Sequence, residues 1–127
     1  ENLEQREKNK TNEVIEAQLK NCLKNIGKNQ IKKITIAYEP IWAISRGDPH
    51  HKAATSQDAE EGHKFIREVA EEMFDRKISK NIRIIYGGSM KPENAKELLS
   101  MPNINGGLVG NASLNAKSFA EIVNNAE

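Results

Sequence analysis

Three short apolar runs, each followed by a helical pattern, constrain most strongly what this chain can fold into. They cover residues 34–38, 82–86 and 107–109. The first run is β-branched and continuously apolar, which is typical of a strand buried on both faces of a sheet. Strands that alternate with helices favour a parallel sheet joined by helical crossovers. The sequence therefore predicts an α/β fold with the element order α-βα-βα-βα.

The first helical pattern extends over residues 11–26 and is followed by Gly27. Glycine is common just beyond a helix C-terminus because it accepts positive φ, so we expect the helix to end there. Cys22 is the single cysteine of the chain and lies among the apolar positions of this pattern. A single cysteine cannot form an internal disulfide bond, and we expect a buried structural thiol.

The later helices carry start signals. Thr55 and Asp58 have the spacing of a capping box, in which two side chains satisfy free backbone N–H groups at a helix start. Pro92 suits the first turn of another helix. Apolar residues at helical spacing predict a last helix around residues 119–123.

Composition argues against two classes of partner. Nineteen basic and eighteen acidic residues leave a formal net charge of +1, without the basic excess that binding to a nucleic-acid backbone requires. We therefore expect no nucleic-acid partner. No apolar segment resembles a signal peptide or a membrane span. We expect a cytoplasmic protein without a membrane partner.

A carboxylate, Glu39, follows the first apolar run directly. Parallel α/β proteins place catalytic groups at the C-terminal ends of strands. A carboxylate there can act as a general base if it is shielded from bulk water and within hydrogen-bond reach of the substrate carbon. Taken alone, a Glu–Pro pair would more often be a surface glutamate at a strand end.

Short segments that begin with glycine follow the other two runs. They are Gly87-Gly88-Ser89 and Gly110-Asn111, and Ala112-Ser113 then fits the start of a short helix. A dianionic phosphate is held well by converging backbone N–H groups and the positive end of a helix. A Gly-Gly-Ser segment by itself is more often a flexible turn. The two segments together predict a phosphate cup.

Residues 38–44, 84–89 and 107–114 resemble, in this order, three segments of the triosephosphate isomerase family, and the resemblance extends over the whole chain. It implies a TIM (β/α)8 barrel, a fold that needs at least about 200 residues. We therefore expect residues 1–127 to be a single partial domain, the C-terminal half of such a barrel, with about three parallel strands and crossover helices. Since the first residue is Glu1 rather than Met, we expect a fragment of a longer protein.

The resemblance assigns the catalytic base to Glu39, and the family is itself a standard example of a glutamate base paired with a neutral histidine. It implies the interconversion of glyceraldehyde 3-phosphate and dihydroxyacetone phosphate through an enediolate, in glycolysis and gluconeogenesis, without a cofactor. The substrate phosphate would be bound by Ser45, Ser89, Gly110 and Asn111. Ser45 and Asn111 stand at positions where the family commonly has glycine.

A lid that closes over the substrate is also implied. Its hinges would be Pro40-Ile41-Trp42 and Lys52-Ala53-Ala54. Four additional residues, Asp48-Pro49-His50-His51, predict a lid longer than the family's usual one. Asp48, His50 and His51 are interpreted as a solvated loop tip, because adjacent histidines point apart in an extended chain and no full ligand set is visible. We expect no metal site.

Three further contacts follow from the resemblance. Glu1 would contact the lid tryptophan, Trp42. Tyr86 would bond the closed lid near Ala54. Arg67 would hydrogen-bond Asn105, which stands where the family has an aspartate.

The family's lysine and electrophilic histidine belong to the N-terminal half of the barrel, and none of His50, His51 and His63 stands at a position that matches that histidine. We expect the chain alone to lack isomerase activity and to associate through its uncovered sheet. Its partners would be the N-terminal half of the barrel, a triose phosphate substrate and, in the intact protein, a second copy in a homodimer. The alternative is a non-catalytic half-barrel that binds phosphate or serves in assembly.

Overall fold

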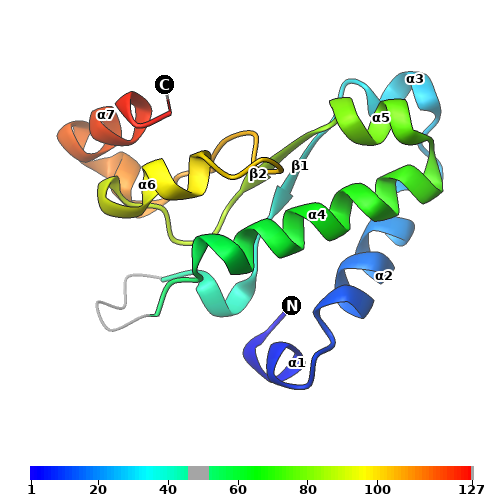
Figure 1. The fold of residues 1–127 in the computed structure, drawn as a ribbon, viewed down its shortest axis with the longest axis horizontal. Coiled ribbons are helices and arrows are strands. Elements are labelled where there is room, and N and C mark those ends of the chain that lie inside the picture. The colour runs from blue at the N-terminus through cyan, green and yellow to red at the C-terminus, as the bar shows by residue number, and fades with distance from the viewer. Residues whose placement is uncertain (46–51, 127) are drawn as a thin grey trace.

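The computed structural model describes residues 1–45 and 52–126. Helices and strands share this part of the chain, and α4 lies across a small two-stranded sheet (Figure 1). The α-helices are α1 (Leu3–Glu7), α2 (Thr11–Leu23), α3 (Lys28–Ile31), α4 (Ser56–Met73), α5 (Arg76–Asn81), α6 (Pro92–Leu99) and α7 (Ala116–Asn124). The strands are β1 (Thr35–Tyr38) and β2 (Arg83–Tyr86), and the 3-10 helices are η1 (Ile41–Ala43) and η2 (Asn111–Leu114).

The sheet is parallel, as predicted, but its third strand is reduced to a bridge. β1 pairs with β2 in the register Thr35 with Arg83 to Tyr38 with Tyr86. Gly107 forms only an isolated parallel bridge with Tyr86. The prediction of a strand over residues 107–109 is therefore wrong for the described residues. The run is three residues long and begins with a glycine that has no side chain to pack, which weakens a strand.

Burial of the strands is one-sided. Tyr38 is buried, whereas Thr35 and Ala37 are exposed, so the prediction of a strand buried on both faces is wrong. In β2 the alternation is similar, with Ile84 fully buried and Arg83 exposed. Because successive side chains of a strand point to opposite faces, this alternation shows that one face of the sheet is covered and the other open.

The covered face packs against α4, which lies across the strands in Figure 1. Ala59, Ile66 and Val69 of α4 are each at most 2% exposed and join a core that includes Ile84 and Tyr86. The helix starts as predicted. The Thr55 hydroxyl accepts from the Asp58 N–H at 3.1 Å, and the Asp58 carboxylate accepts from the Thr55 N–H at 3.0 Å.

The start of α6 is also confirmed, with Pro92 in its first turn, and α7 falls where the last helix was predicted. The predicted end of the first long helix at Gly27 is wrong, because α2 stops at Leu23. Gly27 instead precedes α3 with extended backbone, and its N–H donates to the Gln30 side chain at 2.8 Å. That hydrogen bond makes Gly27 the start of the next helix.

Cys22 is exposed, so the prediction of a buried thiol is wrong. Ile15, Leu19 and Leu23 form the buried stripe of α2, and Cys22 lies at the margin of that stripe. A residue one position before a buried one is rotated by about 100° around a helix.

In the described part of the chain, none of the helices has both the length and the apolar character needed to span a membrane.

Candidate functional site

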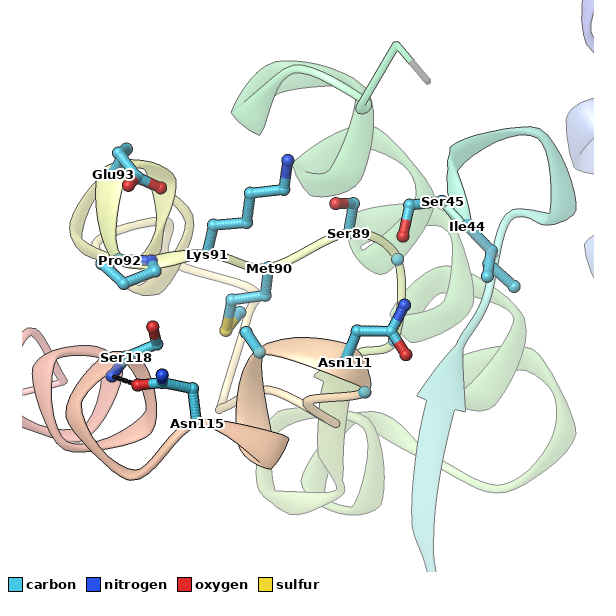
Figure 2. Close-up of a pocket in the computed structure, with 14 residues that line it drawn as sticks. Ile44, Ser45, Ser89, Met90, Lys91, Pro92, Glu93, Asn111, Asn115 and Ser118 are labelled. Carbon is cyan, nitrogen blue, oxygen red and sulfur yellow. Dashed lines mark hydrogen bonds between the residues drawn. The ribbon is translucent and has the colours of Figure 1, made fainter. Parts of the chain in front are cut away.

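Four residues predicted to bind phosphate line one cavity of about 470 Å³. Figure 2 shows Ser45, Ser89 and Asn111 around this hollow. Ser45 comes shortly after η1, Ser89 follows β2, and Gly110 and Asn111 open η2. The ends of β1 and β2 and the bridge at Gly107 lie side by side in the sheet, so the loops that leave them meet at this edge.

The backbone N–H groups around the cavity are not equally free. Ser89 donates its N–H to the Ala43 carbonyl at 2.9 Å, so that donor is occupied. The Gly110 carbonyl accepts from both the N–H and the hydroxyl of Ser113, at 2.9 and 2.7 Å. In a trans peptide the N–H points opposite to the carbonyl. The Asn111 N–H therefore points away from this turn, and no described residue accepts from it.

The two glycines before Ser89 make room for neighbouring side chains. A Cβ at Gly87 would lie 2.5 Å from Cγ of Glu39. A Cβ at Gly88 would lie 2.1 Å from the hydroxyl oxygen of Tyr86, whose ring is fully buried. Sequence reasoning connected these glycines with the approach of a ligand. Packing gives a second reason that the sequence alone did not reveal.

Glu39 follows β1 at the edge where the loops meet, with its side chain against Gly87. The residue is exposed, so the described residues do not provide the shielding from water that a general base was expected to have. A groove of about 460 Å³ runs beside it along β1 and α2. This groove is open because β1 is an edge strand of the described sheet.

The first predicted hinge is held by a buried carboxylate. Glu1 is 5% exposed and accepts a hydrogen bond from the Trp42 indole N–H at 2.8 Å. The Tyr38 hydroxyl donates to the same carboxylate at 3.1 Å. Burial raises the pKa of Tyr38 well above its usual range, and the charge of Glu1 raises it further. The guanidinium of Arg6 lies 4.9 Å from the centre of the Trp42 ring.

The second predicted hinge leads into the start of α4. Ala54 is buried, Ala53 half-buried and Lys52 exposed. Asp58, which caps α4 here, forms an ion pair with Arg6. Burial opposes ionisation of Asp58, but the hydrogen bonds from Thr55 and the charge of Arg6 lower the pKa of its carboxyl. Arg6 therefore contacts groups next to both predicted hinges.

Tyr86 was predicted to bond the closed lid near Ala54. Its hydroxyl is buried and has no hydrogen-bond partner among the described residues. Burial raises the pKa of Tyr86 to about 12, with a smaller contribution from the charge of Asp58. A buried hydroxyl without a partner is costly, so this group stands out among the described residues.

The predicted contact between Arg67 and Asn105 is present. The guanidinium donates to the Asn105 side-chain oxygen at 2.6 Å and to the carbonyls of Ser79, Ile82 and Asn103 at 2.7 to 3.1 Å. His63 is fully buried, and its Nδ1 lies 2.7 Å from the Ala59 carbonyl oxygen. Its ring packs edge-on against Tyr38, with centroids 5.5 Å apart. Arg67 thus joins α4 to backbone groups of other segments, and His63 packs α4 against β1.

Sequence reasoning missed part of the cavity lining. Lys91, Glu93, Asn115 and Ser118 also line the cavity of the phosphate-binding candidates, and all four are labelled in Figure 2. Lys91 comes two residues after Ser89 and directly before Pro92, and this position beside the loop was the available signal. The described residues hold no group of three or more metal-binding side chains. Asp48, His50 and His51 lie outside the described residues.

Comparisons with known proteins match one family over nearly the whole chain. The model of the family "Triosephosphate isomerase" matches residues 1–126. A triosephosphate isomerase from Chloroherpeton thalassium is 49% identical over 127 residues, which are 100% of this chain and 49% of that protein. A triosephosphate isomerase from Fusobacterium nucleatum is 52% identical over 123 residues, 97% of this chain and 47% of that protein. The chain thus spans about half the length of the curated relatives it matches.

Proposed function

Because the chain belongs to the triosephosphate isomerase family, we propose that it provides the base and the phosphate cup of a triosephosphate isomerase. The observation that carries the proposal is the single cavity lined by Ser45, Ser89, Gly110 and Asn111. Glu39 lies on Gly87, the residue that opens the Ser89 loop. The base and the cup are therefore adjacent.

The reaction is a proton transfer between neighbouring carbons. The Glu39 carboxylate removes a proton from the carbon next to the substrate carbonyl, and the electrons of that C–H bond form the enediolate. The protonated Glu39 then returns the proton to the former carbonyl carbon, while the hydroxyl proton of the first carbon moves to the oxygen of the former carbonyl. Together the two proton transfers convert dihydroxyacetone phosphate to glyceraldehyde 3-phosphate. Atoms and charge balance without a redox cofactor.

The cup holds the phosphate while the proton moves. Ser45 and Ser89 supply hydroxyl groups, and Asn111 supplies a backbone N–H that no described residue uses. Such donors are preorganised because they belong to loops tied to the sheet. Binding at the phosphate fixes the reacting carbons relative to Glu39, which lowers the entropic cost of reaction.

The chain alone is incomplete as an isomerase. Its relatives are about twice as long, and the groove beside Glu39 is open. We expect the lysine and histidine of the mechanism to come from the N-terminal half of the protein, which also shields Glu39. The intact protein then acts as a homodimer. A non-catalytic half-barrel that binds phosphate is the competing function.

The test is an isomerase assay, coupled to a dehydrogenase, on a chimera with the N-terminal half of the Chloroherpeton thalassium relative fused ahead of Glu1. We expect turnover by the chimera and none by residues 1–127 alone. Glu39→Gln in the chimera keeps the shape of the side chain and removes the base, so kcat should fall by about 10²- to 10⁴-fold. Glu13→Gln, on α2, is the matched control and should leave kcat unchanged.

Three results would contradict the proposal. A folded chimera without turnover, established by circular dichroism, would favour the non-catalytic function. A Glu39→Gln variant that retains more than about a tenth of the wild-type kcat would exclude Glu39 as the base. Turnover by residues 1–127 alone would refute the claim that the chain is incomplete.

A further inference from the structure

Lys91 is the single cation among the described residues that line the phosphate cavity. We propose that Lys91 attracts and helps to retain the dianionic phosphate, as a long-range electrostatic complement to the short-range donors of the cup. The proposal rests on the proposed phosphate site. It adds a residue that neither the motifs nor the comparisons assign.

The backbone at Lys91 is fixed to the cup. The side chain of Asn94 accepts a hydrogen bond from the Lys91 N–H at 2.7 Å and donates one to the Ser89 carbonyl at 3.0 Å. One amide group thus holds both residues. Pro92 follows and limits φ at the start of α6. The Lys91 side chain therefore leaves the loop from a constrained point, two residues from Ser89.

The Lys91 side chain extends on the Ser89 side of the cavity. Figure 2 shows the ammonium end of Lys91 and the hydroxyl of Ser89 on the same side of their loop. Lys91 is exposed, and none of the ion pairs between described residues involves it. A lysine without a carboxylate partner keeps its full charge available to a ligand.

Glu93 carries the opposite charge to Lys91 at the same cavity. It lines the same cavity on the far side of Pro92 and is exposed. Its carboxylate repels a phosphate dianion as the ammonium of Lys91 attracts one. Unit charges a few ångströms apart in water still interact by an amount comparable to thermal energy, and a dianion doubles it. Removal of the two charges should therefore change phosphate affinity in opposite directions.

The test is a titration of the 127-residue chain with inorganic phosphate, followed by isothermal titration calorimetry at low and high ionic strength. At about 0.01 M salt, where the Debye length is about 30 Å, Lys91→Met should raise the Kd about three- to tenfold. Glu93→Gln should lower it, and Lys91→Arg should match the wild type. At about 1 M salt, where the Debye length is about 3 Å, the differences should largely disappear.

Lys96→Met is the matched control, because Lys96 is exposed on α6 outside the cavity lining and its loss changes net charge equally. Phosphate binding by wild type with equal Kd values for Lys91→Met and Lys96→Met overturns the role of Lys91 and leaves the cup intact. A salt-independent loss in Lys91→Met also overturns it, since that indicates a structural effect. No phosphate binding by the wild type overturns both the cup and the role of Lys91.

Discussion

The buried carboxylate of Glu1 accepts a 2.8 Å hydrogen bond from the indole N–H of Trp42. The same residue's backbone carbonyl accepts from the Ile41 N–H at 3.0 Å. Two consecutive residues of η1 are thereby bound to the segment that precedes α1. Two hydrogen bonds to Glu1 therefore hold the predicted first hinge at this end.

Trp42→Phe should lower the free energy of unfolding by about 1–3 kcal/mol, because it removes a donor from a buried carboxylate. Chemical denaturation monitored by circular dichroism measures the change. Ile41→Ala is the comparison, since the Ile41 side chain is 47% exposed and should matter much less. Equal losses for the two variants would mean that the Glu1 hydrogen bond contributes little.

Gly88→Ala should destabilise the chain by about 1–3 kcal/mol, because the new methyl group collides with the buried Tyr86 ring. Gly110→Ala is a matched control from the same cavity, as a Cβ there meets no atom within 4 Å. Thermal unfolding of both variants tests the difference. A Gly88→Ala protein as stable as the wild type would show that Tyr86 moves at low cost.

Stability should fall as pH drops below 6.5, the ordinary pKa of histidine. Burial lowers the pKa of His63 in the folded state, against the hydrogen bond with the Ala59 carbonyl. The unfolded chain therefore binds a proton at a pH where the folded chain does not, and acid favours unfolding. His63→Gln should flatten the pH dependence of the unfolding free energy between about pH 6.5 and 5. An unchanged slope would assign the effect to other groups.

The 127-residue chain should associate in solution. Leu114, Phe119 and Val123 are 86%, 42% and 52% exposed and come from η2 and α7. Neighbouring apolar side chains of this size favour contact with another surface. The double variant Leu114→Ser and Phe119→Ser should reduce association in sedimentation velocity. Leu3→Ser, 55% exposed on α1, should not.

The sequence predicted the fold best at helix starts, where a residue and a near neighbour in the sequence determine the local structure. The Thr55 and Asp58 capping box and the position of Pro92 were found because they depend on sequence spacing alone. The end of α2 was not, because a hydrogen bond between Gly27 and Gln30 redirected the glycine to the next helix. Burial of Cys22 was mispredicted because neighbouring positions on a helix differ in direction by about 100°.

Properties of the site that depend on residues far apart in the sequence were harder to predict. The two glycine segments predicted that Ser89, Gly110 and Asn111 would form a cup, and the family resemblance added Ser45. The exposure of Glu39 depends on which elements cover β1, and the position of Lys91 depends on where Asn94 holds its backbone. Neither can be obtained from spacing.

The hydrogen bond from Ser89 to the Ala43 carbonyl creates competition for a single donor. A phosphate oxygen that uses the Ser89 N–H must displace that carbonyl, so part of the binding free energy is consumed in freeing the segment that contains Trp42. By thermodynamic reciprocity, phosphate bound at this donor weakens the Ala43 contact by the same factor by which loss of that contact raises phosphate affinity. A phosphate that takes the Ser89 N–H would therefore couple ligand occupancy to the position of the segment that contains Trp42.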